Sequence, residues 1–300
     1  ALVGHVAVVS IIMILGKMFP IFVYRDEVNF NTRLALSLGM SPRGEVGAGV
    51  IVISLNYGIG GDATSFMPQL HGLSGRRRTL SWNMPGYGPS APMAEMSFAS
   101  LCDRLCAALD ALGIDRVVIA GQSIGGMIAQ EMAIRHPHRI AGLVLIATVP
   151  AFGGRDDSFR DSFLAARLAP LDKGVSMADL AAEAIPAVMG PEADAETVRD
   201  AVAAMARIPQ AAYRQVLQTL VTFNRRDDQH LIDCPCCLIA GGHDDNSPAR
   251  VMEKMAGRLK AATFHIVESA GHLVNSEAGD ECNAIIERFL KDLRADTETV

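Results

Sequence analysis

The 300-residue sequence is poor in aromatic side chains, which make up 5% of it and include a single tryptophan. It also lacks an excess of basic charge, because 27 Lys and Arg residues face 33 Asp and Glu residues and give a formal net charge of −6. Nucleic-acid binding needs basic residues that replace the counterions of phosphate, and single-strand binding adds aromatic rings that stack on bases. The sequence therefore argues against a nucleic-acid partner.

Cysteines are also few, since six in 300 residues do not make a disulfide-stabilised scaffold. Three of them crowd into the apolar segment 234–237, and Cys102 and Cys106 share one helix face. Neither group has the paired ligand spacing and nearby histidines of a zinc site. We therefore expect no metal site, and buried thiols in a reducing compartment, the cytoplasm.

The apolar run from Val6 to Leu15 is too short to cross about 30 Å of hydrocarbon as a helix. A signal peptide would carry its positive charge before the apolar run, whereas Lys17 follows it. We interpret this run as a core-facing or edge element, which disfavours a membrane partner. Export or membrane association through this segment stays open.

Half of the sequence is hydrophobic and a fifth is charged, so the chain can bury a full core. From residue 46, short β-branched runs alternate with longer helical patterns, and the runs are continuously apolar, as in parallel strands buried on both faces. The expected strands are 50–55, 78–82, 116–120 and 141–147, and the expected helices between them are 97–112 and 124–135. This order predicts an α/β fold with a mostly parallel, doubly wound sheet.

The pattern changes after Val149. Residues 156–224 show no convincing strand, only Ala-rich helical stretches broken at Pro170, Gly174, Pro186, Gly190-Pro191 and Pro209. A strand–helix–strand pattern then returns at 237–240, 249–259 and 263–267, with a closing helix at 280–293. We predict an α/β domain formed by 46–152 and 228–300, with an inserted all-helical lid at 153–227 over a ligand pocket.

The motif Gly-x-Ser-x-Gly occurs at Gly121–Gly125, with Ser123 at its centre. The bare motif is weak, but here it follows a predicted strand directly and opens a predicted helix, which is the strand–turn–helix context of a nucleophilic serine. The flanking positions must lack bulk because neighbouring backbone presses on them. A Gly-rich packing turn or phosphate loop is the alternative, although the Gly-Lys-Ser/Thr ending of the latter is missing.

A serine hydroxyl needs a base to become nucleophilic, and the base needs an orienting acid. Asp244 follows the expected strand 237–240, and His272 follows the expected strand 263–267. Because parallel strands end at the same edge of a sheet, both groups can converge on Ser123.

These motifs together resemble the α/β-hydrolase superfamily, specifically its small lidded esterase and lactonase branch, from about residue 50 to 293. The matching stretches are Gly58–Gly61, Asn83–Gly88, Gly121–Gly126, Asp244 with Pro248, and Gly271–His272. The resemblance implies Ser123 as nucleophile, His272 as general base and then acid, and Asp244 as the group that orients the imidazole. Residues 1–45 match only loosely, with 23–30 in the place of the family's opening hairpin.

Each of these assignments has a rival in the sequence. Asp245 is adjacent to Asp244, but the family's spacing from aspartate to proline favours Asp244. His243 and His265 are interpreted as surface or strand residues, and His265 also lacks the preceding glycine of the Gly-His pattern. His272 itself has the alternative interpretation of a satisfied core histidine.

The resemblance further implies an oxyanion hole formed by the backbone N–H groups of Ile59 and Ile124. In this scheme Gly58, Gly121 and Gly125 support the turns on which the donors and the nucleophile lie.

The chain departs from the family at three positions: Tyr57 replaces the usual His, Asn83 the usual Asp, and Gly242 a frequent Glu. Backbone donors do not depend on side-chain identity, so the oxyanion hole can persist if Gly58 holds its turn. Losing one donor would raise the barrier by about 2.7–4 kcal/mol.

A serine nucleophile disfavours the family's epoxide hydrolases and haloalkane dehalogenases, which need a carboxylate there. We predict acyl transfer to water without a cofactor, on a small or medium ester or lactone, because the lid sequence is rich in Ala, Leu and Met. Two alternatives stay open: C–C bond hydrolysis or perhydrolysis on the same triad, and a non-catalytic small-molecule-binding protein. The sequence leaves the oligomeric state open, a homo-oligomer included.

Overall fold

The computed structural model describes residues 51–55, 58–75, 77–153 and 158–298. Our expectations for residues 1–50 and for Tyr57 lie outside the described residues. Within the described ranges, no helix is long and apolar enough to cross a membrane.

Six strands form one sheet in the order β2-β1-β3-β4-β5-β6, and every neighbouring pair is parallel. The strands are β1 (Ile51–Leu55), β2 (Thr79–Ser81), β3 (Val117–Gln122), β4 (Ile140–Ile146), β5 (Cys236–Gly241) and β6 (Ala262–Val267). All residues of β3 and β5 are buried, which explains why their sequences are apolar throughout. The predicted parallel sheet is confirmed.

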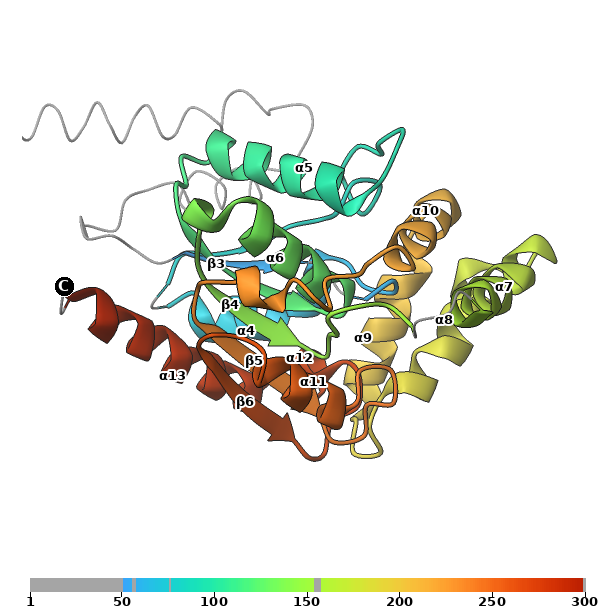
Figure 1. Cartoon of the computed structure of the whole chain (residues 1–300). Coiled ribbons are helices and arrows are strands. Elements are labelled where there is room, and N and C mark those ends of the chain that lie inside the picture. Colours follow the sequence, from blue (N-terminus) through green and yellow to red (C-terminus); the bar gives the residue numbers. More distant parts are fainter. Residues whose placement is uncertain (1–50, 56–57, 76, 154–157, 299–300) are drawn as a thin grey trace, which may run out of the picture. The chain divides into compact units, whose positions relative to one another are not determined.

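Helices cover both faces of the sheet (Figure 1). One face carries α5 (Phe98–Ala111), α6 (Ile124–Arg135) and α11 (Ala249–Ala256), and the other carries α4 (Met67–Leu73), α12 (Val274–Glu277) and α13 (Gly279–Glu298). Side chains alternate along β3 accordingly: Val117 and Ile119 pack towards α5 and α6, whereas Val118 and Ala120 pack towards α13. The doubly wound arrangement is therefore confirmed, while the short helices α4 and α12 were not predicted.

Four helices, connected in the chain between β4 and β5, lie together beyond one end of the sheet (Figure 1). They are α7 (Ser158–Asp172), α8 (Met177–Ala184), α9 (Ala195–Ala206) and α10 (Gln210–Leu220), and we call them the insert. An antiparallel bridge joins Ala151 to Asn224, so the two ends of the insert meet. The break expected at Pro170 was wrong by two residues, because Pro170 lies inside the last turn of α7.

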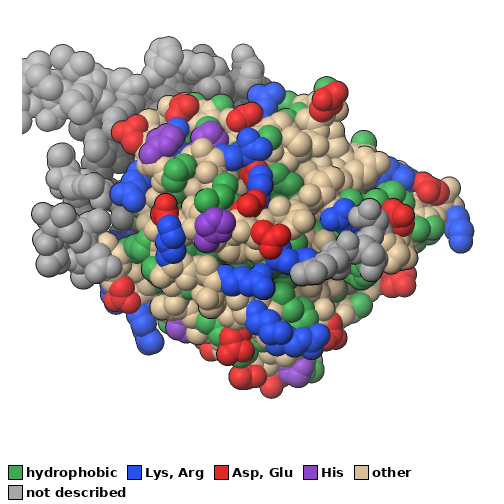
Figure 2. Space-filling model, viewed as in Figure 1, with side chains coloured by type: hydrophobic (Ala, Val, Ile, Leu, Met, Phe, Trp, Pro, Cys, Tyr) green, Lys and Arg blue, Asp and Glu red, His purple; other side chains and the backbone are tan. Residues whose placement is uncertain are grey.

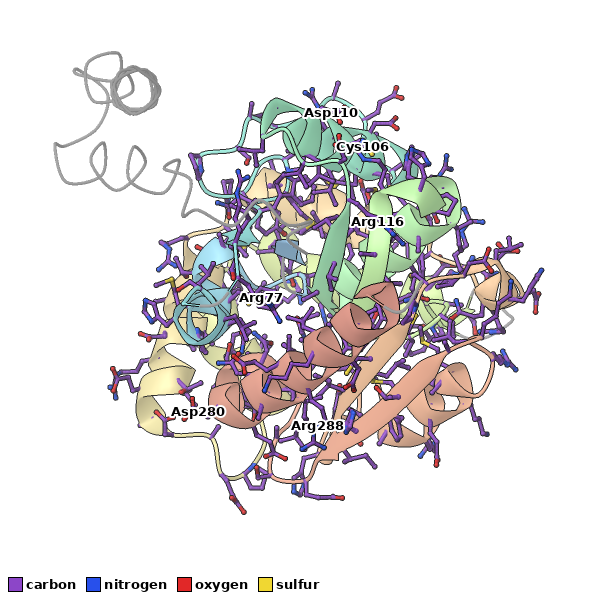
Figure 3. All side chains as sticks on the ribbon, turned by 90° about the vertical axis from the view of Figure 1, so that its left-hand side faces the viewer. Arg77, Cys106, Asp110, Arg116, Asp280 and Arg288 are labelled. Carbon is purple, nitrogen blue, oxygen red and sulfur yellow. The ribbon has the colours of Figure 1, made fainter. Side chains whose placement is uncertain are left out.

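Acidic and basic side chains are interspersed over the face in Figure 2. All six cysteines are free thiols, and Cys106 lies beside Asp110 on α5 (Figure 3). Among the described residues, no group of three or more His, Cys, Asp or Glu side chains has the arrangement of a metal site.

Candidate active site

Ser123 lies in a sharp turn between the end of β3 and the start of α6. Its φ of 53° and ψ of −119° fall in a region that non-glycine residues rarely adopt. The turn leaves no room beside it: a Cβ on Gly121 would lie 2.3 Å from the carbonyl carbon of Gly125, and a Cβ on Gly126 would lie 2.6 Å from Cγ2 of Thr148. Glycines are therefore required at 121 and 126, and Gly125 contributes its backbone to the contact.

Hydrogen bonds from β4 and the residues after it hold this strained turn. The Ser123 N–H donates to the carbonyl of Ile146 at 2.9 Å, and the Thr148 hydroxyl donates to the carbonyl of Ser123 at 2.7 Å. The nucleophile candidate is thus fixed to the neighbouring strand as well as to its own.

The structure brings Asp244 and His272 together, 28 residues apart in the sequence. His272 Nδ1 lies 2.8 Å from Asp244 Oδ2, and Asp244 is 4% exposed. The other oxygen, Oδ1, accepts hydrogen bonds from the N–H groups of Asn246 at 2.8 Å and Ser247 at 3.0 Å. Since the bond to Asp244 Oδ2 occupies Nδ1, the other ring nitrogen of His272, Nε2, is the one available for proton transfer.

None of the three rival residues has a hydrogen bond like that between Asp244 and His272 among the bonds described above. Asp245 is exposed and contributes to a cavity wall, and His243 is exposed. His265 is half-buried within β6, where burial lowers the pKa of its imidazole.

Ser123 and His272 line the same cavity, which has a volume of about 1210 Å³. Gly58 and Ile59 also line it, and a Cβ on Gly58 would lie 3.2 Å from the Ser123 hydroxyl oxygen. Ile124 is the first residue of α6, so its N–H has no acceptor within the helix. The turn at Gly58 and the start of α6 therefore both lie next to the serine hydroxyl.

Gln122 is a site residue that the sequence reasoning missed. Its fully buried side chain accepts a hydrogen bond from the Gly58 N–H at 2.8 Å and donates one to the His272 carbonyl at 2.7 Å. Gln122 occupies a variable position of the Gly-x-Ser-x-Gly motif, and both of its partners are backbone atoms, so no sequence signal indicated this role.

Two of the departures from the family pattern have a structural explanation. Asn83 still supplies an acceptor, because its Oδ1 takes a hydrogen bond from the Ala63 N–H at 3.0 Å. At Gly242, a Cβ would lie 2.5 Å from the carbonyl oxygen of Glu268, so a glutamate would not fit this backbone.

Part of the cavity wall is aromatic. The ring of Phe152 lies 4.8 Å from that of Phe163 and 5.7 Å from that of Phe159, and the guanidinium carbon of Arg167 lies 4.4 Å above the ring of Phe163. Ring pairs at these distances form a favourable apolar surface, which the stacked arginine extends.

A family model described as alpha/beta hydrolase fold matches residues 51–278, and the chain belongs to this family. The chain is similar to a protein named as a carbamate hydrolase, RutD, of Caulobacter sp. (strain K31), with 28% identity over 79% of this chain and 90% of that protein. It is also 28% identical to the pimeloyl-(acyl-carrier protein) methyl ester esterase of Aromatoleum aromaticum, over 69% of this chain and 85% of the esterase.

Among solved structures, the thermophilic esterase of Thermogutta terrifontis has the same fold, with a TM-score of 0.74 and 21% identity over 82% of this chain and 91% of the esterase.

Proposed function

We propose that this protein is a serine hydrolase that cleaves a small or medium carboxylic ester or lactone through an acyl-serine intermediate. The observation that carries the proposal is the hydrogen-bonded pair of His272 and Asp244, which opens on the same cavity as Ser123 in its strained turn. The esterase and hydrolase names of the relatives support the reaction class.

In the first half of the reaction, the Ser123 hydroxyl oxygen attacks the substrate carbonyl carbon and His272 takes the hydroxyl proton. Collapse of the tetrahedral intermediate breaks the carbonyl–alkoxide bond, and His272 gives the proton to the leaving oxygen. Asp244 holds the Nδ1–H tautomer and stabilises the imidazolium. A water molecule then attacks the acyl-serine with the same proton transfers, which releases the acid and restores Ser123.

The negative charge on the carbonyl oxygen needs preorganised donors. We assign this role to the backbone N–H groups of Ile59 and Ile124, since Ile59 lines the same cavity as Ser123 and Ile124 follows the serine at the start of α6. Gln122 supports the first donor by holding the turn at Gly58.

The cavity favours an apolar acyl or alcohol group. Its volume of about 1210 Å³ exceeds the roughly 300–1,000 Å³ that is usual for small-molecule sites, and the Phe152, Phe159 and Phe163 rings line part of it. The insert supplies much of the wall through α7 and α9, so we assign it the role of a lid.

Labelling with a fluorophosphonate probe tests the nucleophile. The purified protein should label stoichiometrically, Ser123→Ala should not label, and Ser162→Ala, an exposed serine on α7, should label as the parent does. Labelling that persists in Ser123→Ala would contradict the proposal.

A substrate panel tests the reaction class. Aryl esters and lactones should be hydrolysed with kcat/KM well above that for diketones. The variant Phe163→Ala should raise KM for long acyl esters about tenfold and leave KM for acetyl esters unchanged. The reason is that burial of an aromatic ring contributes about 1.5–3 kcal/mol, and only a long acyl chain would reach the ring. Preferential cleavage of diketones would indicate C–C bond hydrolysis instead. Tight ligand binding with neither a burst nor turnover would indicate a non-catalytic protein.

A further inference from the structure

The insert touches the loop that carries His272 through two glycines. A Cβ on Gly190, between α8 and α9, would lie 2.4 Å from the Ser269 carbonyl oxygen and 2.8 Å from the Gly271 nitrogen. Conversely, a Cβ on Gly271 would lie 2.5 Å from the Gly190 nitrogen and 2.6 Å from the Val188 carbonyl oxygen. The two backbones are therefore in direct contact, with no space for a side chain on either side.

Hydrogen bonds join these two segments. The His272 N–H donates to the Val188 carbonyl at 2.8 Å. The Glu277 carboxylate, at the end of α12, accepts three more: from Gly190 N–H at 2.6 Å and Gly271 N–H at 3.0 Å through Oε2, and from Leu273 N–H at 2.9 Å through Oε1. One carboxylate thus binds the insert and both neighbours of His272.

We infer that Glu277 is a positioning residue that ties residues 188–190 of the insert to the His272 loop and so helps to orient the imidazole, which Asp244 binds directly. This inference rests on the proposed function, because it assigns the tie a part in catalysis. It also means that this end of the insert moves together with the catalytic base rather than independently of it.

A carboxylate is the group that this arrangement requires. Two ionised oxygens can accept all three bonds, and hydrogen bonds to an ionised acceptor are stronger than neutral ones. A glutamine at 277 has one acceptor oxygen, and its amide group would face a backbone N–H as donor against donor. Glu277 itself does not line the cavity that holds Ser123, so its loss removes no direct contact with the substrate.

The kinetic test compares Glu277→Gln with Glu281→Gln, an exposed glutamate on α13, using an activated aryl ester. Displacement of a catalytic group by about 1 Å can cost about 100-fold in rate. We expect Glu277→Gln to lower kcat 10- to 100-fold with KM within about twofold of the parent, and Glu281→Gln to behave as the parent. Gly190→Ala, which disrupts the tie from the insert side, should give the same split between kcat and KM.

Amide hydrogen exchange of the full chain tests the tie without relying on activity. In Glu277→Gln, the peptides covering 186–192 and 269–274 should lose protection together, including the His272 amide, which Glu277 does not itself bind. Protection in β3 should stay unchanged, which separates the local effect from global unfolding.

Parental kcat in Glu277→Gln, or exchange that increases only at 269–274, would overturn the inference. A fall in kcat that merely follows a loss of folded protein would overturn it as well. If the parent protein neither reacts with the fluorophosphonate probe nor hydrolyses the ester, the proposed function fails. The tie is then judged by hydrogen exchange alone, and a loss of protection in Glu277→Gln at only one of the peptides 186–192 and 269–274 would reject it. Should Glu277→Gln not fold, Glu277→Asp, too short to reach all three donors, is held to the same outcomes.

Discussion

Gln122 directly precedes the nucleophile candidate Ser123. Its side chain is hydrogen-bonded to the Gly58 turn and to the backbone of His272. Gln122→Glu keeps the acceptor for Gly58 but places a buried carboxylate oxygen against the His272 carbonyl. We expect unfolding free energy to fall by about 1–3 kcal/mol, and kcat to fall more than KM changes. Urea unfolding and steady-state hydrolysis of an aryl ester measure the two effects.

Gln130→Glu is the matched control, because Gln130 is also buried, on the helix α6 that follows Gln122 in the chain, but does not contact Gly58 or His272. It should lose stability without a specific loss in kcat. Equal losses in kcat for both variants would contradict a positioning role for Gln122.

The backbone strain at Ser123 predicts a trade of activity for stability. Its φ of 53° costs a non-glycine residue about 1–3 kcal/mol, whereas glycine adopts this conformation freely. Ser123→Gly and Ser123→Ala should both be inactive, but the glycine variant should be the more stable by about 1 kcal/mol. Thermal unfolding compares them, and a less stable glycine variant would show that the turn carries no strain.

Sequence motifs predicted Ser123, Asp244 and His272 because each is marked by local neighbours: glycines around the serine, a proline after the aspartate and a glycine before the histidine. Gln122 and Glu277 have no such marks. Gln122 bonds to backbone groups that are 64 and 150 residues away in the sequence. Glu277 bonds to the Gly190 N–H, which is 87 residues away. Only the folded chain reveals such contacts.

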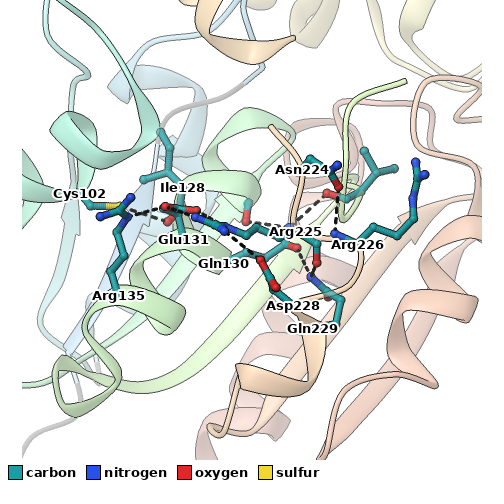
Figure 4. A network of polar contacts seen from close by, with 12 residues as sticks. Cys102, Ile128, Gln130, Glu131, Arg135, Asn224, Arg225, Arg226, Asp228 and Gln229 are labelled. Carbon is teal, nitrogen blue, oxygen red and sulfur yellow. Dashed lines mark hydrogen bonds and ion pairs between the residues drawn. The ribbon is translucent and has the colours of Figure 1, made fainter. Parts of the chain in front are cut away.

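At the scale of elements, a polar network fixes α6 to the segment that follows the insert (Figure 4). Glu131 accepts hydrogen bonds from Arg225 Nε at 2.6 Å and Nη2 at 2.8 Å, and also pairs with Arg135. Arg225 Nη1 donates to Asp228 at 2.8 Å, and the Arg225 N–H donates to the Pro150 carbonyl at 2.8 Å. The helix that begins beside Ser123 is thereby anchored to the base of the insert.

Arg225→Met should therefore destabilise the protein by about 3 kcal/mol, since Glu131 is buried and would lose one of its two cations. A double-mutant cycle with Glu131→Gln measures the coupling between the two side chains. Additive effects would show that the pair contributes nothing beyond its separate parts.

The same network makes stability depend on pH. Burial raises the pKa of Glu131, but hydrogen bonds from Arg225 and Arg135 outweigh burial and hold the pKa below its usual value near 4.5. A lowered pKa in the folded state means a contribution that is present above the unfolded value and is lost as pH falls through the folded one. The stability difference between the parent and Glu131→Gln should thus shrink below about pH 4 in urea titrations, and a constant difference would refute it.

At the scale of the whole molecule, the cysteines report on global unfolding. Burial raises the pKa of Cys237 to about 11, and burial raises the pKa values of Cys102 and Cys282 further. Because only thiolates react readily, Ellman's reagent at pH 8 should first modify the half-buried Cys234, whose pKa a hydrogen bond from Cys236 lowers, and the half-buried Cys106. The three buried thiols should react only at the rate of unfolding. Fast modification of all six thiols in the native protein would contradict the burial described.

The parallel direction of the strands and their alternation with helices along the chain were predictable, because buried parallel strands have continuously apolar sequences and connections between them follow few topologies. The short helices α4 and α12 were not, since four to seven residues carry no helical periodicity. Pro170 misled the sequence analysis for a related reason, because only surrounding contacts decide whether a proline ends a helix or is tolerated in its last turn.

The meeting of the insert's two ends at Ala151 and Asn224 bears on how such a region could be exchanged between relatives. A segment that leaves and re-enters a framework at adjacent positions can be replaced by another of different length without altering the register of β4 and β5. The glycine pair at 190 and 271 limits this freedom. A transplanted segment must have a glycine at the position opposite Gly271. Chimaeras with a larger residue there should fold but have low catalytic activity.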